Sequence, residues 1–189
     1  LPLHGRGYTT SEGAFRVPTI VWQPGTVPAG TVCEELATTM DLLPTFAKLA
    51  GGKTPADRKI DGHDISPLLF GEPDAKTPYE AFYYYHQDQL QAVRSGPWKL
   101  FLPVNNIQGH PHFKANQPPE TLLFNVVGDI SSERNVAKDH PEVVARLTNY
   151  AEQARADLGD RDRPGAGQRP AEKITGAPQP RLLPGNEVR

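Results

Sequence analysis

The stretch YEAFYYYHQDQLQAVRSGPWKLFL, Tyr79 to Leu102, decides the fold of this chain of 189 residues. Its first part, Phe82–Tyr85, is an aromatic run of the kind found in strands. Two further runs, Leu90–Arg94 and Trp98–Leu102, flank Ser95-Gly96-Pro97, and this arrangement is typical of a hairpin. The stretch therefore predicts the beginning of an antiparallel sheet.

Residues downstream extend this sheet and cover it. Thr121–Val126 predicts a further strand, which gives a sheet of three or four strands. A helix follows Asp139-His140, with Pro141 in its first turn. Its apolar residues recur with helical period and share one face: Val143, Val144, Leu147, Tyr150, Ala151, Ala154 and Leu158. Because this face can cover the sheet, we expect a small α+β unit.

Residues upstream predict one strand and one helix that pack together. The run Thr19–Trp22, between Pro18 and Pro24-Gly25, is apolar on both faces, as in a strand inside a parallel sheet. The helix is capped by Asp41 or Thr39 and ends at Gly51-Gly52. Its apolar stripe consists of Leu42, Leu43, Phe46, Leu49 and Ala50.

The composition excludes several classes of protein. A net charge of −2 provides no basic face for nucleic acid. No apolar run approaches the roughly 20 residues of a membrane span. The single cysteine, Cys33, excludes an internal disulfide and is expected to be a small buried hydrophobe. With 20 prolines and 17 glycines the chain is rich in loops, so the expected core is modest.

Three segments, in this order, resemble parts of the type I sulfatases of the alkaline phosphatase superfamily. The first is GRGYTTSEGAFRVPTIVWQPG, Gly5 to Gly25. The second is TTMDLLPTFAKLAGG, Thr38 to Gly52, followed by DRKIDGHDISPLLFG at Asp57–Gly71. The third is Tyr79–Leu102, and DISSERNVA, Asp129 to Ala137, is similar to the loop before the family's final helix. The chain is thus similar to the C-terminal part of a sulfatase of the arylsulfatase and N-acetylgalactosamine-sulfatase branch.

The resemblance implies an α/β fold in three parts. Residues 1–75 are expected to form the end of the sulfatase α/β sandwich domain. Residues 76–159 are expected to form a small C-terminal antiparallel sheet with a covering helix. Residues 160–189, rich in proline and glycine, form a tail that wraps a surface or stays mobile. The chain is then a processed product, a partial reading frame or a truncated protein.

The resemblance also implies the hydrolysis of a sulfate ester. The family's nucleophile is a formylglycine made from the first residue of Cys/Ser-x-Pro-x-Arg, and a calcium ion polarises the sulfate. This motif does not occur here, and Cys33 is followed by Glu34-Glu35-Leu36. We therefore expect the nucleophile and the calcium ligands outside this chain, no metal ligand within it, and no activity from the chain alone. The implied substrate is a sulfated small molecule or glycan, the implied partner is the N-terminal part of the catalytic domain, and the implied location is periplasmic or secreted.

Arg6 is the candidate cation for binding sulfate. The family has a lysine five residues before the glutamate of Glu-Gly-Gly, and here that glutamate aligns with Glu12 and the lysine with Gly7. Arg6 is the neighbouring residue, and a guanidinium suits a tetrahedral oxyanion because it bonds in a bidentate way. Either Arg6 supplies the charge or the sulfate contact of this loop is lost.

Four histidines are candidates for the rim of the substrate site, where the family often has a histidine from its C-terminal region. His110 and His112 form a His-Pro-His run that has three readings: a solvated loop, a substrate rim or a metal site. His86 follows the tyrosine strand, and His4 precedes the basic loop.

Two other functions are compatible with the sequence. A phosphodiesterase or phosphonate hydrolase shares the fold, although Glu12-Gly13-x-x-Arg16 and Asp41-Leu42-x-Pro44-Thr45 favour a sulfatase. A sugar-binding module without enzymatic activity is the other, with Tyr83–Tyr85 and Trp98 stacking on sugar rings.

Overall fold

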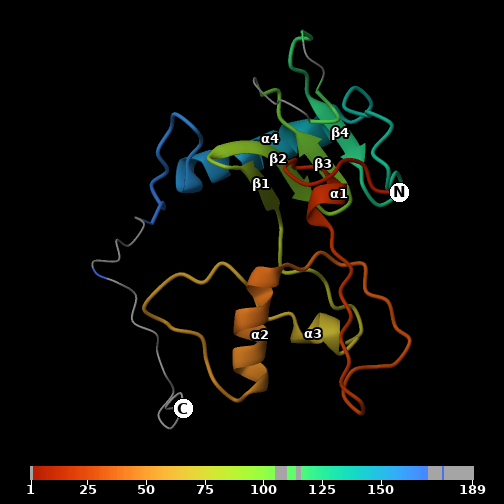
Figure 1. Cartoon of the computed structure of the whole chain (residues 1–189), viewed down its shortest axis with the longest axis vertical. Helices are drawn as coiled ribbons and strands as arrows, with labels where there is room; N and C mark the ends of the chain where they lie inside the picture. Colours follow the sequence, from red (N-terminus) through yellow and green to blue (C-terminus); the bar gives the residue numbers. More distant parts are fainter. Residues whose placement is uncertain (1, 105–109, 114–115, 170–175, 177–189) are drawn as a thin grey trace, which may run out of the picture.

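The computed structural model describes residues 2–104, 110–113, 116–169 and 176. Its elements, in chain order, are α1 (Glu12–Phe15), the 3-10 turn η1 (Thr39–Asp41), α2 (Leu42–Leu49), α3 (Ser66–Leu69), β1 (Phe82–His86), β2 (Gln89–Ser95), β3 (Trp98–Phe101), β4 (Leu122–Asn125) and α4 (Pro141–Leu158). The four strands, α1 and α4 form one unit, and α2 and α3 lie together beside it (Figure 1). None of the helices in this described part is long and apolar enough to cross a membrane.

The sheet has the strand order β1-β2-β3-β4, and every neighbouring pair is antiparallel. The predicted antiparallel sheet with a covering helix is therefore confirmed. The pairing of β1 with β2 changes register after Tyr84, which pairs with Ala92, because Tyr85 pairs with Leu90. The extra residue on β2 is Gln91, so β2 carries a bulge at this point.

One face of the sheet packs against α4. The buried cluster on this face consists of Leu90, Val93, Leu100, Leu102 and Leu123 from the sheet side and of Val143, Leu147, Ala151 and Ala154 from the helix. Leu147 and Ala151 have no exposed surface. The stripe predicted from helical period is the face that α4 buries, except for Leu158 at its end, which is 38% exposed.

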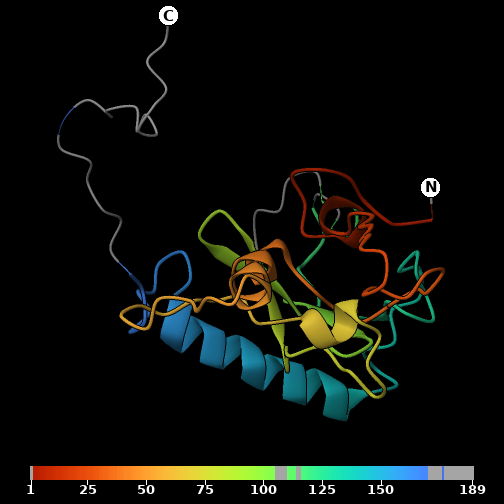
Figure 2. The same cartoon turned by 90° about the horizontal axis from the view of Figure 1, so that it is seen from below.

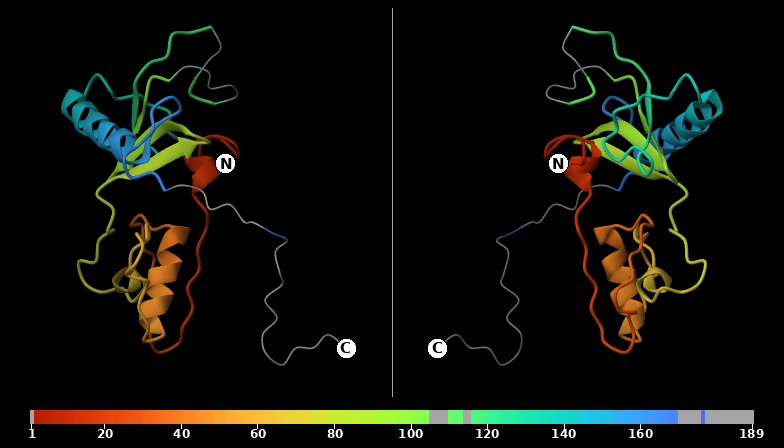
Figure 3. Two further views of the ribbon diagram at one scale, coloured as in Figure 1. Left: turned by 90° about the vertical axis from the view of Figure 1, so that its left-hand side faces the viewer. Right: turned by 90° about the vertical axis from the view of Figure 1, so that its right-hand side faces the viewer.

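The opposite face of the sheet receives the N-terminal segment. Its buried cluster consists of Tyr84, Ala92, Phe101, Leu122, Phe124 and Val126. Phe15 of α1 meets the ring of Tyr84 edge to face, with 5.0 Å between the ring centroids. Figures 2 and 3 show α1 and α4 on opposite sides of the sheet. The sheet is thus a middle layer between segments that are far apart in the sequence.

The unit formed by α2 and α3 is organised by the buried carboxylate of Asp41. This carboxylate accepts hydrogen bonds from the backbone N–H of Thr38 at 2.6 Å, from that of His63 at 2.8 Å and from the hydroxyl of Tyr79 at 2.5 Å. Gly62 is required beside it, since a Cβ there would lie 2.0 Å from the carbonyl oxygen of Met40. The run Asp61-Gly62-His63-Asp64 therefore packs its backbone closely against that of η1.

Three expectations for the N-terminal residues are wrong. Thr19–Trp22 forms no strand, and Ile20 and Trp22 are 93% and 82% exposed. A strand needs a neighbour for its N–H and C=O groups, and no described segment pairs with this run. The apolar stripe of α2 faces outward, with Phe46 57% exposed, because no described element covers it. Cys33, in the same open segment, is exposed and not buried.

The first residues of the predicted tail wrap the surface between the two units. Arg169 donates to the carbonyl of Lys59 at 2.8 Å and to the carboxylate of Asp61 at 2.6 Å. Lys59 in turn pairs with Asp157 of α4 at 3.3 Å. Residues 170–175 and 177–189 of the expected tail lie outside the described residues. The domain boundaries at 75/76 and 159/160 stay a prediction.

We expect Leu147→Ala to lower the free energy of unfolding by about 2–5 kcal/mol, because it leaves a cavity between α4 and the sheet. Urea denaturation measures this change. Leu158→Ala, the same substitution at the exposed end of α4, is the control and should cost much less. Equal losses in the two variants would contradict the assignment of this face as the core.

Candidate functional site

The loop Gly5–Thr10 is a tight turn that projects Arg6 into solvent. Gly5 has a φ of +82°, and a Cβ on it would lie 1.9 Å from the hydroxyl oxygen of Ser11, so only glycine fits. The hydroxyl of Thr9 donates to the carbonyl of Arg6 at 2.8 Å and closes the turn. Arg6 and Gly7 are exposed at its tip. The two glycines thus have different roles, since the Cβ position of Gly7 has open space around it.

The start of α1 packs directly against the backbone of this loop. The N–H of Gly13 donates to the carbonyl of His4 at 2.8 Å, and a Cβ on Gly13 would lie 2.4 Å from the carbonyl oxygen of Gly5. Ala14, which stands where the family has its second glycine, lies within α1. A right-handed helix accommodates alanine without strain, so this departure from the family pattern costs little.

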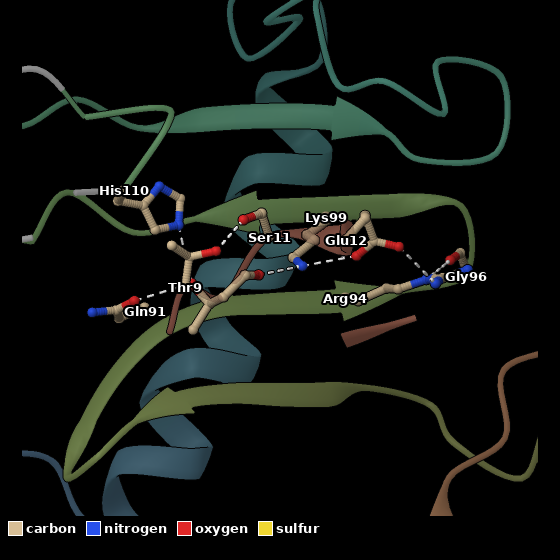
Figure 4. A network of polar contacts seen from close by, with 9 residues as sticks. Thr9, Ser11, Glu12, Gln91, Arg94, Gly96, Lys99 and His110 are labelled. Carbon is tan, nitrogen blue, oxygen red and sulfur yellow. Dashed lines mark hydrogen bonds and ion pairs between the residues drawn. The ribbon is translucent and has the colours of Figure 1, made fainter. Parts of the chain in front are cut away.

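A buried ion pair joins α1 to the sheet. The Nζ of Lys99 on β3 lies 2.8 Å from Oε1 of Glu12, and both side chains are fully buried (Figure 4). The same Nζ donates to the carbonyl of Thr10 at 2.6 Å and lies 3.6 Å from the ring centroid of Tyr84. Arg94 reaches the second oxygen of Glu12 at 3.5 Å. Burial lowers the pKa of Lys99 to about 8, while the charge of Glu12 acts in the opposite direction.

The side chain of Thr10 provides a second attachment of the loop to the sheet. Its hydroxyl donates to Oε1 of Gln91 at 3.0 Å and lies 3.2 Å from Nε2 of His110. Gln91 is the extra residue of the bulge in β2. Because of the bulge, the side chain of Gln91 reaches Thr10 on the same face of the sheet on which its neighbour Ala92 packs. The amide of Gln91 is itself held by Gln89 at 3.1 Å.

Three of the four predicted histidines come together beside this attachment. The rings of His4 and His112 are stacked, with 4.4 Å between their centroids, and His110 lies 5.6 Å from His112. The Nε2 atoms of His4 and His112 are buried and have no hydrogen-bond partner among the described residues. Burial lowers the pKa of His110 to about 4 and that of His112 to about 3, and neighbouring positive charges add to the effect.

The remaining predicted residues lie at the edge of this cluster or outside it. His86 is half-buried at the end of β1, and its charge contributes to the lowered pKa of His110. Tyr84 is 3% exposed, so it is part of the core and offers no face to a sugar. Lys99 was missed as a functional candidate. The sequence did contain a signal for it. Lys99 stands two residues before Phe101 in the same strand, so the two side chains share one face of the sheet, and a charged residue is unusual on a buried apolar face.

Among the residues that the structure describes, no group of three or more His, Cys, Asp or Glu side chains could hold a metal ion. The described residues therefore do not fit the calcium ion of the family. The two histidines of the His-Pro-His run pack against aromatic residues of the sheet. The ring of His112 is stacked on that of Phe124, with 4.6 Å between centroids, and the ring of His110 meets that of Phe101 edge to face, with 5.2 Å between centroids.

Comparisons with known proteins agree with this arrangement. Residues 77–171 match the family described as the C-terminal region of aryl-sulfatase, and residues 1–52 match the sulfatase family. The chain is 44% identical over 171 residues to the N-acetylgalactosamine-6-sulfatase of Canis lupus familiaris, which covers 79% of this chain and 32% of the relative. It is 43% identical over 170 residues to the arylsulfatase D of Homo sapiens, which covers 76% of this chain and 28% of the relative.

The fold is similar to that of a solved structure from work on the metabolism of multiple glycosaminoglycans by Bacteroides thetaiotaomicron. The TM-score is 0.65 at 25% identity, over 82% of this chain and 32% of that one. The chain belongs to the sulfatase family, and its sheet with α4 corresponds to the family's C-terminal region. It spans less than a third of the length of the two curated relatives named above.

The two buried histidines should make the stability of the chain sensitive to acid. An unfolded histidine has a pKa of about 6.5, so between about pH 6.5 and pH 4 the unfolded chain binds protons that the folded chain excludes. Their contribution to the free energy of unfolding is complete above pH 6.5 and is lost as the pH falls towards 4. We expect a loss of roughly 1–3 kcal/mol between pH 7 and pH 5 in urea denaturation.

The variant His112→Phe should reduce this dependence, because phenylalanine keeps the contacts with Phe101 and Phe124 but does not titrate. His63→Gln, in the other unit, is the matched control and should leave the dependence unchanged. Equal unfolding free energies at pH 7 and pH 5 in the original chain would contradict the conclusion that His110 and His112 are buried in the neutral form.

Proposed function

We propose that this chain is the C-terminal part of an enzyme that hydrolyses sulfate esters. The observation that carries the proposal is the match to the two sulfatase families in chain order, at residues 1–52 and 77–171. The buried pair of Glu12 and Lys99 supports it, because it joins the two matched segments into one framework. By the same resemblance we propose a periplasmic or secreted location, and we propose that the chain needs the rest of the catalytic domain for activity.

In this proposal Arg6 binds the sulfate group. Arg6 is exposed at the tip of the loop. It is therefore available to a tetrahedral oxyanion, which a guanidinium holds through two parallel hydrogen bonds. A donor fixed before reaction stabilises negative charge that develops on the transferring group. The rim histidines stay a proposal: His4 and His112 are only partly exposed and their Nε2 atoms are buried, so both rings would have to move to meet a substrate, whereas His110 is 3% exposed and contacts Thr10.

The proposed substrate is a sulfated small molecule or a sulfated glycan. Two similar proteins support this substrate class by their names alone. One is named for N-acetylgalactosamine 6-sulfate, and the other comes from work on glycosaminoglycan metabolism. The calcium ion and the formylglycine of the family would polarise and attack the sulfate when present. The residues described here contribute a cation, a loop framework and a rim to that chemistry.

The proposed partner of the apolar N-terminal surface is the rest of the catalytic domain. This surface consists of Val17, Ile20, Val21, Trp22, Val32, Leu42, Leu43, Phe46 and Leu49, all at least 42% exposed. So many exposed large apolar side chains on one unit are unusual for an isolated soluble protein and are typical of an interface. Thr19–Trp22 would then complete a strand against a neighbouring strand of that domain.

In the complete enzyme we expect Arg6→Ala to lower turnover roughly 100- to 1000-fold, the range for removing one donor to a developing oxyanion. Gly7→Lys in the Arg6→Ala background should recover part of the loss, since it restores the position of the family lysine in open space. Steady-state kinetics with a chromogenic sulfate ester measure both. Arg16→Ala, which removes another exposed arginine, is the control and should leave turnover unchanged. This chain alone, with added calcium, is the blank and should show no turnover. Turnover within twofold of the original for Arg6→Ala would show that Arg6 does not bind the sulfate.

For the chain alone we expect self-association through the apolar N-terminal surface. Replacing Ile20 and Phe46 with serine should raise the concentration at which oligomers form by roughly tenfold or more, because it removes apolar area from the interface. Sedimentation velocity over a concentration series measures this change. Val127→Ser, at a similarly exposed apolar residue of the other unit, is the matched control. A monomer at all concentrations would contradict the interface.

A further inference from the structure

The attachment of the loop Gly5–Thr10 to the sheet is more polar than its packing requires. Lys99 has no exposed surface, and burying a lysine ammonium costs several kcal/mol unless it is paired and fully hydrogen-bonded. A hydrophobic residue at this position of β3 would fill the space at lower cost, as its strand neighbours on this face do. The ammonium therefore supplies something that apolar packing does not, namely directed hydrogen bonds.

Those hydrogen bonds all run from the sheet to the segment that carries the loop. Lys99 Nζ holds the carbonyl of Thr10 at 2.6 Å and Oε1 of Glu12 at 2.8 Å. Gln91 and His110 hold the hydroxyl of Thr10 from either side, at 3.0 and 3.2 Å. Thr10 is thus held at its backbone and at its side chain, four residues after Arg6.

The groups that face Lys99 come from every layer around it. Glu12 of α1 is its counter-charge, Tyr84 of β1 lies under its ammonium, and Arg94 of β2 contacts the other carboxylate oxygen of Glu12. His110, whose pKa is lowered in part by Lys99, closes the site from the following loop. Without the ammonium, Glu12 would keep only the longer contact with Arg94, and the carbonyl of Thr10 would lose this partner.

We propose that Lys99 is a positioning residue, which fixes the loop Gly5–Thr10 from the C-terminal sheet and so sets the place of Arg6. The proposal rests on the proposed function for the role of Arg6, but the fixing of the loop is a property of this chain alone. The C-terminal unit is then part of the framework of the sulfate-binding loop. A shift of about 1 Å in a positioned group can cost about 100-fold in rate, so the effect is measurable at a distance.

The first experiment measures hydrogen–deuterium exchange in this chain without any substrate. In Lys99→Met we expect the amides of residues 5–14 to exchange at least tenfold faster, while those of β4 and α4 keep their rates. Lys99→Arg, which keeps the charge, should restore the rates to within about threefold of the original. Lys48→Met, which removes the exposed partner of Asp64, is the matched control and should change nothing in residues 5–14.

A second variant covers the case in which Lys99→Met does not fold. Thr10→Val keeps the shape of the side chain and leaves Lys99 and Glu12 in place, but removes the hydroxyl that Gln91 and His110 hold. We expect faster exchange of the amide of Gly13, which donates to the carbonyl of His4 and so reports on the loop, by roughly threefold or more. Unchanged exchange of the loop in Thr10→Val, or in a folded Lys99→Met, would overturn the fixing of the loop by the sheet.

The second experiment places the same variants in the complete enzyme. Lys99→Met should lower kcat by roughly 10- to 100-fold with less effect on KM, and Lys99→Arg should recover most of the loss. A kcat equal to the original, in a variant whose loop exchanges faster, would overturn the positioning role. An original enzyme that hydrolyses no sulfate ester would refute the proposed function instead, and the exchange result would still decide whether Lys99 fixes the loop.

Discussion

The ion pair between Glu12 and Lys99 is the interaction on which the arrangement of this chain depends. It joins a four-residue helix near the N-terminal end of the described residues to the third strand of the sheet, 87 positions later. A helix of one turn has no stability of its own, because its few hydrogen bonds do not offset the entropy of ordering it. α1 is therefore held by what it contacts: the ion pair, the edge-to-face ring of Tyr84 and the close approach of Gly13 to the loop backbone.

The two faces of the sheet follow different physical rules. The face towards α4 is apolar throughout, and its stability comes from burying aliphatic side chains with helical and strand period. The face towards α1 holds a buried lysine, a glutamate, a threonine and a histidine in one hydrogen-bonded network. Such a network stabilises a structure only when each member has a partner, so its geometry is narrowly specified. A narrowly specified geometry suits the face that carries the proposed sulfate-binding loop. The face towards α4 requires only that apolar side chains of the right size fill the space between helix and sheet.

The apolar elements of the C-terminal unit were predicted well because local pattern and tertiary packing agree there. The strand at Phe82–Tyr85, the hairpin around Gly96 and the helix that begins at Pro141 form where their patterns predict, and the helix buries its apolar stripe. The pattern failed at Thr19–Trp22, which forms no strand, whereas along α2 it predicted the helix correctly but not the exposure of its apolar residues. A strand and an amphipathic helix both need a second surface, and an amino-acid pattern does not contain that surface.

The sequence by itself determined the antiparallel sheet, its covering helix and the resemblance to sulfatases, because these depend on the period of apolar residues and on local motifs. The resemblance also singled out Arg6 as the candidate cation, because it stands beside the position of the family lysine. Only the tertiary structure decided that His4, His110 and His112 form one cluster and that Lys99 holds Thr10 and Glu12. Those contacts join residues about 80 to 110 positions apart, at distances that depend on the bulge at Gln91 and on the docking of α1. Pairing of this kind is set by the three-dimensional path of the chain, which no local pattern encodes.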